Sequence, residues 1–562
     1  MNIRIIPFIV AVITTAVFLP LQACSGNDDT QAVASAEKTI SAKISNLQKQ
    51  VPVLALKAEC PVLQISVQVE KPSAFTIEKV KIDLGGTTDL NDIQSMKLVY
   101  TGEGPSSNQR QFGEISFPAA SVVFSDNLLV SKPTAYFELF VQLKDRINLL
   151  HRINASCISI ETDAGLIDKI EKSETKGLRV GVALRQHGDD EVHTYRIPGL
   201  TTSKNGTLLA VYDVRRESSR DLQGHIDIGL NRSFDGGATW EPLQIVLDRG
   251  AWGGLSEKFN GISDACILVD ENTNTIFVAG LWMHGILDSN GKWIEGLTES
   301  STNWQHQWSG KGSQPGLGEK QTCQFLITKS TDDGKTWSEP VNLTRMCKKE
   351  EWWLWAPAPG HGITLKDGTV VFPTQGRDAS GKSFSNITWS NDGGKTWHTS
   401  NPASTGTTEN MIAQLNDGSI MLNARDGKNK GNLSATNGRV ISTTVNLGES
   451  WAVHPTSRGA LIEPACMASL HKHEYTENGQ KKSILLFSNP NSKTNRDHMT
   501  IKVSFDDGAT WPEKYWMLLD SGKGRGYSCL TSIDEQTIGI LYEGSQADMI
   551  FQKIALSELL GK

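Results

Sequence analysis

The sequence predicts an all-β protein in which a β-sandwich domain is followed by a six-bladed β-propeller. Three observations support this fold class. Glycine and tryptophan are frequent, with 51 and 15 of 562 residues. Alternating polar and apolar runs occur in the first third of the chain, and one eight-residue pattern recurs in the remainder. Many turns together with many large apolar side chains are typical of repeated β-hairpins.

The N-terminal 24 residues have the features of an export signal. Arg4 gives a short positive region, residues 5–21 are apolar, and Leu21-Gln22-Ala23-Cys24 forms a cleavage site. This tetrapeptide resembles a bacterial lipoprotein box, which predicts lipidation of Cys24 and a membrane anchor, with ordinary signal cleavage as the alternative. Residues 25–47 are small and polar and suit a tether. We therefore expect export to the periplasm, outer membrane or cell surface as a lipoprotein, or otherwise secretion.

Residues 48–176 are expected to form the N-terminal β-sandwich. Residues 62–69 and 75–84 alternate apolar and polar side chains with the period of two that indicates a half-buried strand. Turn signals between such runs favour a sandwich. A charged segment at 171–176 gives way to Gly177 and marks the domain boundary. No catalytic group stands out, so a carbohydrate-binding or spacer role is the hypothesis for this domain.

Residues 177–562 contain an internal repeat with the pattern Ser-x-Asp-x-Gly-x-x-Trp, here named the Asp-box repeat. Four copies and one eroded copy begin at Ser233, Ser330, Ser390, Ser504 and Thr444. The Asp can accept hydrogen bonds from nearby amides, the Gly can take a positive φ, and the Trp covers a hairpin. Most copies are roughly 60 residues apart, which suits a four-stranded blade with loops and predicts about six blades. A propeller arranges such a repeat with only short free edges.

A second set of residues, together with these repeats, resembles the bacterial sialidases. Tyr195-Arg196-Ile197-Pro198 is similar to the Phe/Tyr-Arg-Ile-Pro motif of that family and precedes the first repeat at the family's position. The resemblance continues in order through residues 183–562, and the N-terminal domain resembles the β domain that accompanies such propellers. It implies an exo-α-sialidase that hydrolyses terminal α-linked sialic acids of glycoproteins, glycolipids and oligosaccharides.

The resemblance assigns three arginines to the carboxylate of the sialic acid. They are Arg196, Arg425 in Leu-Asn-Ala-Arg-Asp and Arg496 in Asn-Arg-Asp-His. Sialic acid carries this carboxylate on its anomeric carbon, and a planar guanidinium pairs with a carboxylate through two parallel hydrogen bonds. Glu543, in Leu-Tyr-Glu, resembles the glutamate that orients the first of these arginines.

A tyrosine nucleophile is implied by the same resemblance. Sialidases are an exception among glycosidases in using tyrosine, and an anionic nucleophile would be repelled by the carboxylate on the anomeric carbon. Tyr527, in Gly-Tyr-Ser-Cys-Leu, matches the nucleophile, and Glu409, in Thr-Glu-Asn, matches the base that receives its proton. Reaction through a tyrosyl-enzyme intermediate predicts retention of the anomeric configuration.

The general acid/base is expected on the loop that follows residue 212. By the family pattern, Asp221 protonates the leaving oxygen and then activates water. Three nearby carboxylates are alternatives for this role: Asp213, Glu217 and Asp227. Arg215 resembles the arginine near O4 of the sugar, and Asp264 resembles the aspartate that faces O4 and the N-acetyl side.

The remaining features limit the partners and function classes. The net charge of −7 disfavours nucleic acid as a partner. No Cys-x-x-Cys pair is present, so no metal site is expected, and neither a cofactor nor a protein partner is predicted. The cysteines after Cys24 are expected to be buried thiols, with Cys60–Cys157 as the candidate disulfide. Trp282 is expected either to stack on the substrate or to pack in the core.

Two other functions could use the same propeller. A trans-sialidase would transfer the sialic acid to an acceptor sugar instead of water. A sialic-acid-binding propeller without turnover would keep the arginines but should have lost Tyr527, Glu409 or Asp221. All three are present in the sequence, so hydrolysis is the preferred prediction.

Overall fold

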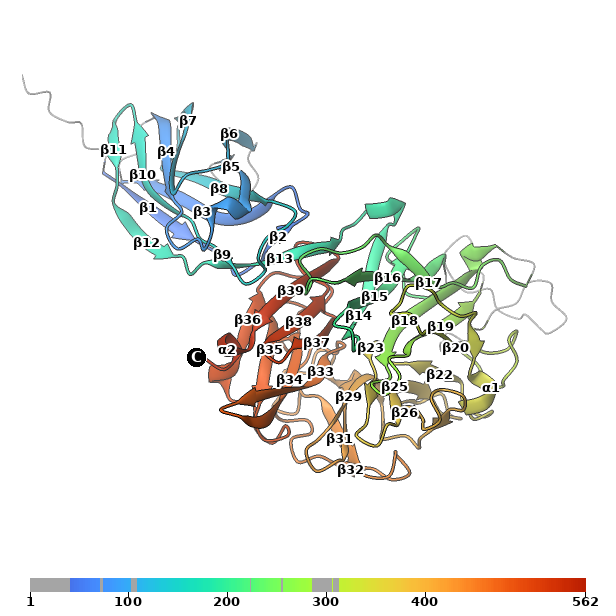
Figure 1. The fold of residues 1–562 in the computed structure, drawn as a ribbon. Helices are drawn as coiled ribbons and strands as arrows, with labels where there is room; N and C mark the ends of the chain where they lie inside the picture. Colours follow the sequence, from blue (N-terminus) through green and yellow to red (C-terminus); the bar gives the residue numbers. More distant parts are fainter. Residues whose placement is uncertain are drawn as a thin grey trace, which may run out of the picture.

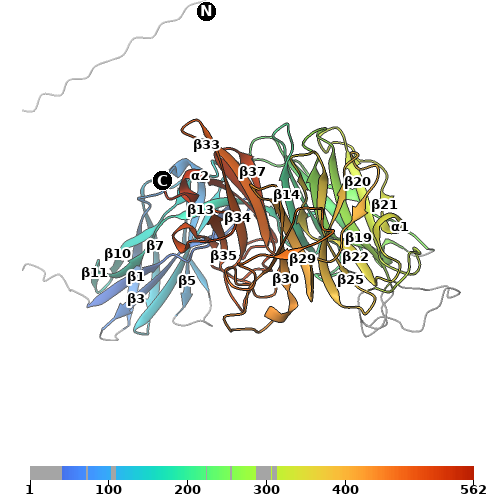
Figure 2. The ribbon, with the colours of Figure 1, turned by 90° about the horizontal axis from the view of Figure 1, so that it is seen from below.

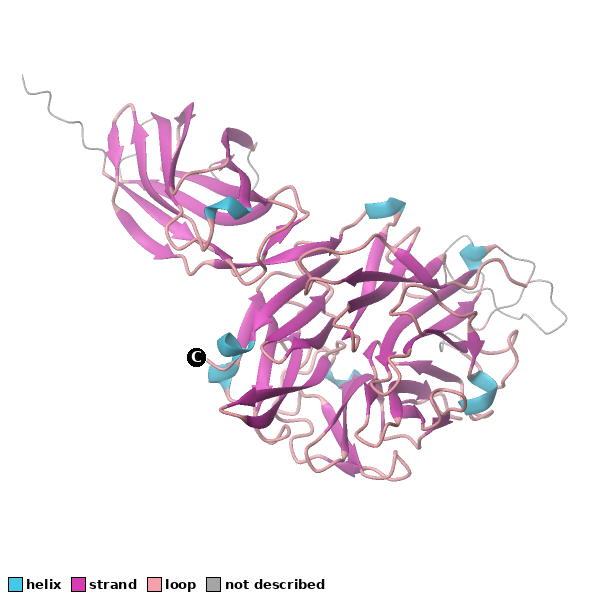
Figure 3. Cartoon of the chain, viewed as in Figure 1, coloured by secondary structure: helices cyan, strands magenta, loops and turns pink. Residues whose placement is uncertain are grey.

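The computed structural model describes residues 41–562 apart from 71–73, 103–108, 223, 254–255, 286–305 and 307–312. The described chain is built from strands with only short helical turns, among them α1 (Thr344–Cys347) and α2 (Leu556–Leu559) (Figure 3). The all-β prediction is therefore confirmed. The export signal, Cys24 and most of the predicted tether lie outside the described residues. Within them, no helix is long and apolar enough to cross a membrane.

Two sheets form the N-terminal sandwich (Figure 1). The first has the order β12 (Ile170–Glu174), β1 (Ala42–Leu47), β3 (Cys60–Val69), β8 (Thr134–Leu143), β5 (Ile93–Gly102) and β6 (Arg110–Ser116). The second has the order β11 (Gly165–Ile167), β10 (Ser156–Thr162), β4 (Phe75–Asp83) and β7 (Ser121–Val130). Alternate residues of β8 are buried along its whole length, as expected for a strand with one face on a core.

The sandwich begins earlier than the predicted residue 48. Strand β1 lies inside the expected tether, where it pairs antiparallel with β3 and parallel with β12. Its buried side includes Asn46, whose side chain exchanges two hydrogen bonds of 3.0 Å with the backbone of Cys157. A short strand with a polar residue on its buried side has little hydrophobic signal of its own, so the sequence pattern did not indicate it.

The cysteines of the described residues are all buried and free, including Cys60 and Cys157. The Cys60 thiol donates to the carbonyl of Leu54 at 3.6 Å. The candidate disulfide is therefore absent, and the expectation of buried thiols is met in this part of the chain. Trp282 is fully buried, so of the two expected roles it has the core one.

Beyond residue 177, the described strands form six sheets around a common centre (Figure 1). The first contains β2 (Val53–Ala55), β13 (Leu178–Arg185), β39 (Met549–Ala555), β38 (Thr537–Tyr542) and β37 (Ser528–Asp534), with β9 (Arg152–Ile153) beside β13. The second contains β14 (Thr194–Thr202), β15 (Leu208–Arg215), β16 (Ile226–Ser233) and β17 (Gln244–Leu247). The third contains β21 (Val341–Asn342), β20 (Gln324–Ser330), β19 (Ile276–His284), β18 (Asn260–Val269) and β23 (Gly360–His361).

The other three sheets complete the ring. The fourth contains β22 (Leu354–Pro357), β25 (Val370–Arg377), β26 (Ser383–Ser390) and β27 (His398–Thr399), with β24 (Ile363–Thr364) beside β25 and β28 (Ser404–Thr405) beside β26. The fifth contains β29 (Thr407–Gln414), β30 (Ile420–Asp426), β31 (Val440–Thr444) and β32 (Ala452–Val453). The sixth contains β33 (Ser469–Glu477), β34 (Gln480–Pro490), β35 (Met499–Ser504) and β36 (Met517–Asp520). Because β13 pairs with β39, the first sheet joins the beginning of the ring to the end of the chain.

The Asp-box repeats are hairpin turns with the expected hydrogen bonds. In the first copy, the amide of Thr239 and the hydroxyl of Ser233 donate to Asp235 at 2.9 and 3.0 Å. Gly237 has φ of 93°, and its carbonyl accepts a 2.9 Å hydrogen bond from the indole of Trp240. A side chain is strained at such a positive φ. The repeat therefore fixes the geometry of the hairpin.

The sandwich contacts the ring beside its first sheet, as Figures 1 and 2 both show. Strand β2 belongs to the N-terminal region by sequence but pairs in parallel with β13. Arg152 and Arg179 both form ion pairs with Glu558 of α2. The amide of Ser521 donates to the carbonyl of Gln50 at 2.7 Å. The predicted boundary at residue 176 thus divides the chain into two regions, and hydrogen bonds and ion pairs connect these regions.

Deletion of residues 41–175 is expected to lower the melting temperature of the protein while leaving the activity implied by the family resemblance measurable on small substrates. The deletion removes β2 and β9 from β13 and exposes buried apolar side chains of that strand. The strands of the other five sheets of the ring keep their own partners. Differential scanning calorimetry and assays at low temperature would check both parts. An unchanged melting temperature would contradict the stabilising role of β2.

Candidate active site

Three strands near the middle of the ring carry predicted site residues at interruptions of their ladders. Arg196 lies on β14, Asp264 on β18 and Glu409 on β29, and the pairing register shifts at each of these places. Ile197 and Asp264 have φ of 62°. A β-bulge adds an unpaired residue and re-aims the neighbouring side chain. Each of these three predicted site residues therefore lies where the regular pairing of its strand is interrupted.

Tyr527 and Glu409 meet across the ring, although 118 residues separate them. The Tyr527 hydroxyl donates a hydrogen bond to one carboxylate oxygen of Glu409. Arg425 Nη1 lies 2.6 Å from the other oxygen and donates to the tyrosine hydroxyl at 3.1 Å. Tyr527 is 5% exposed. The predicted nucleophile, its predicted proton acceptor and a cation that could stabilise a phenolate are therefore in direct contact.

The environment keeps the free tyrosine neutral. Burial, and next the negative charge of Glu409, raise the pKa of Tyr527 well above its usual value, and Arg425 and Arg196 offset this only in part. The proton of the hydroxyl already points to Glu409. The Glu409 carboxylate is thus the group placed to accept a proton from this hydroxyl.

Glu543 orients Arg196 and also holds the backbone of Tyr527. Its two carboxylate oxygens lie 2.8 and 3.2 Å from Nε and Nη2 of Arg196. The same carboxylate accepts hydrogen bonds from the amides of Ile197 at 3.0 Å and Tyr527 at 3.1 Å. Glu543 is 2% exposed. One buried carboxylate therefore fixes an arginine and the tyrosine relative to each other.

The three predicted arginines surround the same tyrosine. The guanidinium carbons of Arg196 and Arg496 lie 5.2 and 5.5 Å from the centroid of the Tyr527 ring. Arg496 Nη1 donates to the carbonyl of Arg525 at 2.9 Å, and Arg425 contacts the tyrosine hydroxyl. A chain with a net charge of −7 thus concentrates cations at one point, which suits an anionic ligand.

Asp221 is the carboxylate of the predicted loop that contacts the pocket arginines. Its Oδ1 lies 2.5 Å from Arg215 Nη1 and 3.5 Å from Arg196 Nη1, and its side chain is 74% exposed. Partial desolvation raises the pKa of Asp221, but the charges of Arg215 and Arg196 outweigh it and lower the pKa below its usual value. Without substrate, Asp221 is therefore an ionised carboxylate at the rim of the site.

The three alternatives to Asp221 lie in different environments. Asp213 is fully buried, accepts from Arg215 at 2.9 Å and Ser263 at 2.6 Å, and has a pKa that burial raises to about 6. Asp227 is buried and pairs with Arg216 at 2.8 Å. Glu217 is exposed on the loop. Asp213 therefore orients Arg215, and Asp221 has the geometry that best suits contact with a ligand.

Asp264 lies beside a residue that sequence reasoning missed. Gln375, on β25, donates to Asp264 Oδ2 at 3.2 Å. Burial raises the pKa of Asp264 well above its usual value, and the negative charges of Glu409 and Asp213 add to this effect. No motif marks Gln375, because its relation to Asp264 arises only when the third and fourth sheets pack together. The nine predicted pocket and catalytic residues within the described chain thus lie in one region.

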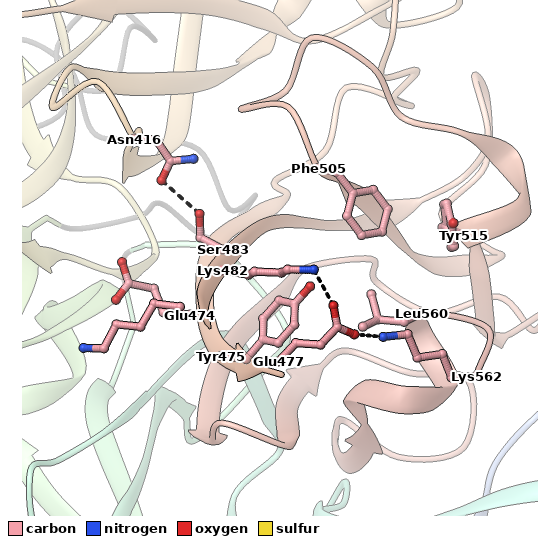
Figure 4. A pocket seen from close by; sticks show the side chains of 11 residues that line it. Asn416, Glu474, Tyr475, Glu477, Lys482, Ser483, Phe505, Tyr515, Leu560 and Lys562 are labelled. Atoms are coloured by element: carbon pink, nitrogen blue, oxygen red, sulfur yellow. Dashed lines mark hydrogen bonds and ion pairs between the residues drawn. The ribbon is translucent and has the colours of Figure 1, made fainter. Parts of the chain in front are cut away.

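A separate cleft of about 680 Å³ lies between the β33–β34 hairpin and the end of the chain (Figure 4). Tyr475, Phe505 and Tyr515 contribute its aromatic lining. Lys482 and Lys562 both contact Glu477 (Figure 4). No predicted site residue lines this cleft. The cleft is therefore separate from the cluster around Tyr527, although it is large.

Comparisons with known proteins identify the families that both regions of the chain match. The family described as BNR repeat-like domain matches residues 206–540, and the family described as N-terminal domain of BNR-repeat neuraminidase matches residues 39–126. A sialidase of Bacteroides fragilis is 39% identical over 523 residues, which cover 88% of this chain and 91% of that protein.

Solved structures extend the comparison. The structure titled Hadza microbial sialidase Hz136 is 35% identical with a TM-score of 0.81, over 92% of this chain and 99% of the other. An intramolecular trans-sialidase from Ruminococcus gnavus is 18% identical with a TM-score of 0.52, over 67% of this chain and 98% of the other. The second likeness concerns the fold alone.

Proposed function

The chain belongs to the sialidases with BNR repeats, and from this premise we propose that it is a retaining exo-α-sialidase with Tyr527 as nucleophile. Its substrates are terminal α-linked sialic acids of glycoproteins, glycolipids and oligosaccharides. The observation that carries the proposal is the contact of the Tyr527 hydroxyl with Glu409 and Arg425, inside a ring of three arginines. We also propose export, with a lipid anchor at Cys24.

In the first step, Arg196, Arg425 and Arg496 bind the carboxylate of the sialic acid. The Tyr527 oxygen forms a bond to the anomeric carbon while its proton passes to Glu409. The bond to the aglycone oxygen breaks, and Asp221 donates a proton to that oxygen. Arg425, 3.1 Å from the tyrosine oxygen, stabilises the negative charge that develops there.

In the second step, water replaces the aglycone. Asp221, now ionised, accepts a proton from the water, whose oxygen attacks the anomeric carbon. The bond to Tyr527 breaks, and Glu409 returns the proton to the tyrosine oxygen. Two displacements on opposite faces give net retention, and every proton is restored.

Substrate binding itself prepares Asp221 to act as an acid. In the free protein, Arg196 and Arg215 lower the pKa of Asp221. A substrate carboxylate paired with Arg196 cancels part of that positive charge, so the pKa of Asp221 rises when the substrate binds. Arg215 and Asp264 are proposed to contact O4 and the N-acetyl side of the sugar, as the family resemblance implies.

The alternatives differ from this proposal in their products. A trans-sialidase would need an acceptor sugar to compete with water for the tyrosyl intermediate. A binding propeller would give no product, and it has no need for the contact between Tyr527 and Glu409. For the N-terminal domain, a carbohydrate-binding or spacer role remains our proposal.

Incubation with sialyllactoses of different linkage, followed by proton NMR, tests the function directly. We expect release of free sialic acid whose first-formed anomer is α, because retention preserves the configuration of the substrate. Adding a lactose acceptor to a sialoside of a different aglycone would reveal transfer as newly formed sialyllactose. Release of the β anomer first would contradict the tyrosyl mechanism, and no release would contradict hydrolysis.

A further inference from the structure

A fully buried ion pair lies behind the site and has no part in the mechanism described above. Arg439, just before β31, and Glu463 each have side chains that are 0% exposed, and Arg439 Nη1 lies 2.6 Å from Glu463 Oε2. Neither residue belongs to the cluster around Tyr527. Taking two charges out of water is costly, and apolar residues of similar size commonly give equal stability. Stability alone is therefore a weak reason for this pair.

The pair holds the backbone on both sides of Arg425. Glu463 Oε1 accepts a 2.7 Å hydrogen bond from the amide of Asp426, the next residue in the chain. Arg439 donates to both the side chain and the carbonyl of Asn423, at 2.6 and 3.0 Å. The ladder between β30 and β31 ends at Ala424. The ion pair thus supplies hydrogen bonds to the backbone of β30 where pairing with β31 ends, while β29 still pairs with Asp426 on the other side.

The same pair reaches the segment that carries the nucleophile. Arg439 Nη1 donates to the carbonyl of Cys466 at 2.7 Å. The Cys466 thiol faces the carbonyl of Arg525 at 3.9 Å, and a Cβ added to Gly526 would lie only 3.1 Å from its sulfur. Gly526 has φ of 91° and directly precedes Tyr527. Cys466 therefore packs against the turn that presents the tyrosine.

One of the other arginines depends on that turn as well. The carbonyl of Arg525, which Cys466 faces, accepts the 2.9 Å hydrogen bond from Arg496 Nη1. Displacement of Cys466 would therefore shift an acceptor that orients a carboxylate-binding group. Through Asp426 on one side and Cys466 on the other, the ion pair connects the strand of Arg425 to the turn of Tyr527.

We propose that Arg439 and Glu463 are positioning residues that hold Arg425 in register with Tyr527 and Glu409. The inference rests on the proposed function, since it assigns a role in aligning that nucleophile. Arg425 and Tyr527 belong to different sheets, and the contact between Arg425 and the tyrosine oxygen is made by side chains alone. The position of Arg425 must therefore be fixed by other contacts. A misplacement of about 1 Å in a reacting group can cost on the order of 100-fold in rate.

The decisive variant replaces both charges with apolar residues, Arg439→Met together with Glu463→Met. Removing both charges avoids an unpaired buried ion, so we expect a melting temperature close to that of the unchanged protein. We expect kcat on an aryl sialoside to fall about 10- to 100-fold because Arg425 is no longer held. The rate of covalent labelling of Tyr527 by a 2,3-difluorinated sialic acid, followed by intact mass, should fall by the same factor.

A second arginine–glutamate pair, whose side chains are 15% and 43% exposed, serves as the control. Arg232 and Glu241 form an ion pair of 2.6 Å on the second sheet near its Asp-box hairpin. The corresponding double change to methionine should leave kcat and labelling unchanged. A double variant of Arg439 and Glu463 with wild-type kcat and labelling would overturn the proposal, because the pair would then be structural only.

A single substitution tests the same idea if the double variant fails to fold. Glu463→Gln keeps the shape of the side chain but brings its amide against Arg439, so alignment should suffer even where circular dichroism shows a native spectrum. A lowered kcat with slowed labelling would support the proposal, and unchanged values in a folded variant would overturn it. Failure of the unchanged protein to hydrolyse any sialoside would instead refute the proposed function.

Discussion

Replacement of Tyr527 by phenylalanine is expected to abolish turnover while sialic acid still binds. The substitution removes the oxygen that attacks the anomeric carbon but keeps the ring against which Arg196 and Arg496 lie. The three arginines can still pair with the substrate carboxylate. Loss of a covalent nucleophile should lower kcat by on the order of 1,000-fold or more. Steady-state kinetics with an aryl sialoside and calorimetric titration with sialic acid would measure the two effects.

Tyr475→Phe provides the comparison for this experiment. Tyr475 is also buried, but it lies on β33 and lines the cleft of Figure 4. Its substitution should leave kcat unchanged. If the Tyr527→Phe variant retained near-normal turnover, another group would have to form the intermediate. If it lost binding together with turnover, the loss would indicate a collapsed pocket instead of a missing nucleophile.

The parts of the fold that the sequence predicts are those encoded by local chemistry. The Asp-box repeat specifies a hairpin within eight residues, so its turns follow from the sequence. Strands β3 and β4 follow from their alternating pattern. Strand β2 cannot be predicted in this way, because its three residues form a strand only by pairing in parallel with β13, more than 100 residues later. Pairings at such a distance leave no local signal.

The residues of the site also fall into those that a sequence motif marks and those that only contacts in the folded chain reveal. Residues inside recognisable motifs, such as Arg196 and Tyr527, can be assigned from their resemblance to a family. Gln375, Arg439 and Glu463 have no motif, and their significance comes from contacts across sheets and loops. The family pattern already favours Asp221 over Asp213, and the structure adds that the two carboxylates lie in different environments. Asp213 is buried against Arg215, whereas Asp221 is exposed at the rim.

The Asp221→Ala variant is expected to lose activity in proportion to how strongly the leaving group needs a proton. Sialyllactose releases a sugar alkoxide that requires protonation, so kcat/KM should fall by about 100- to 10,000-fold. An aryl sialoside with an acidic phenol releases a stable phenolate, so its loss should be much smaller. Glu217→Ala, an exposed carboxylate on the same loop, should affect neither substrate. Equal losses for both substrates in the Asp221 variant would show that it is not the acid.

The pH dependence of the unchanged protein gives an independent check on the same role. A general acid must be protonated, so activity falls as the pH rises through its pKa. For sialyllactose, kcat/KM reports the free protein, in which Arg215 and Arg196 lower the pKa of Asp221. By contrast, kcat reports the complex, in which the substrate carboxylate offsets Arg196 and raises that pKa. The basic limb of kcat/KM should therefore lie at lower pH than that of kcat, and Asp221→Ala should remove both limbs. Coincident limbs would contradict the coupling of Asp221 to the carboxylate-binding arginines.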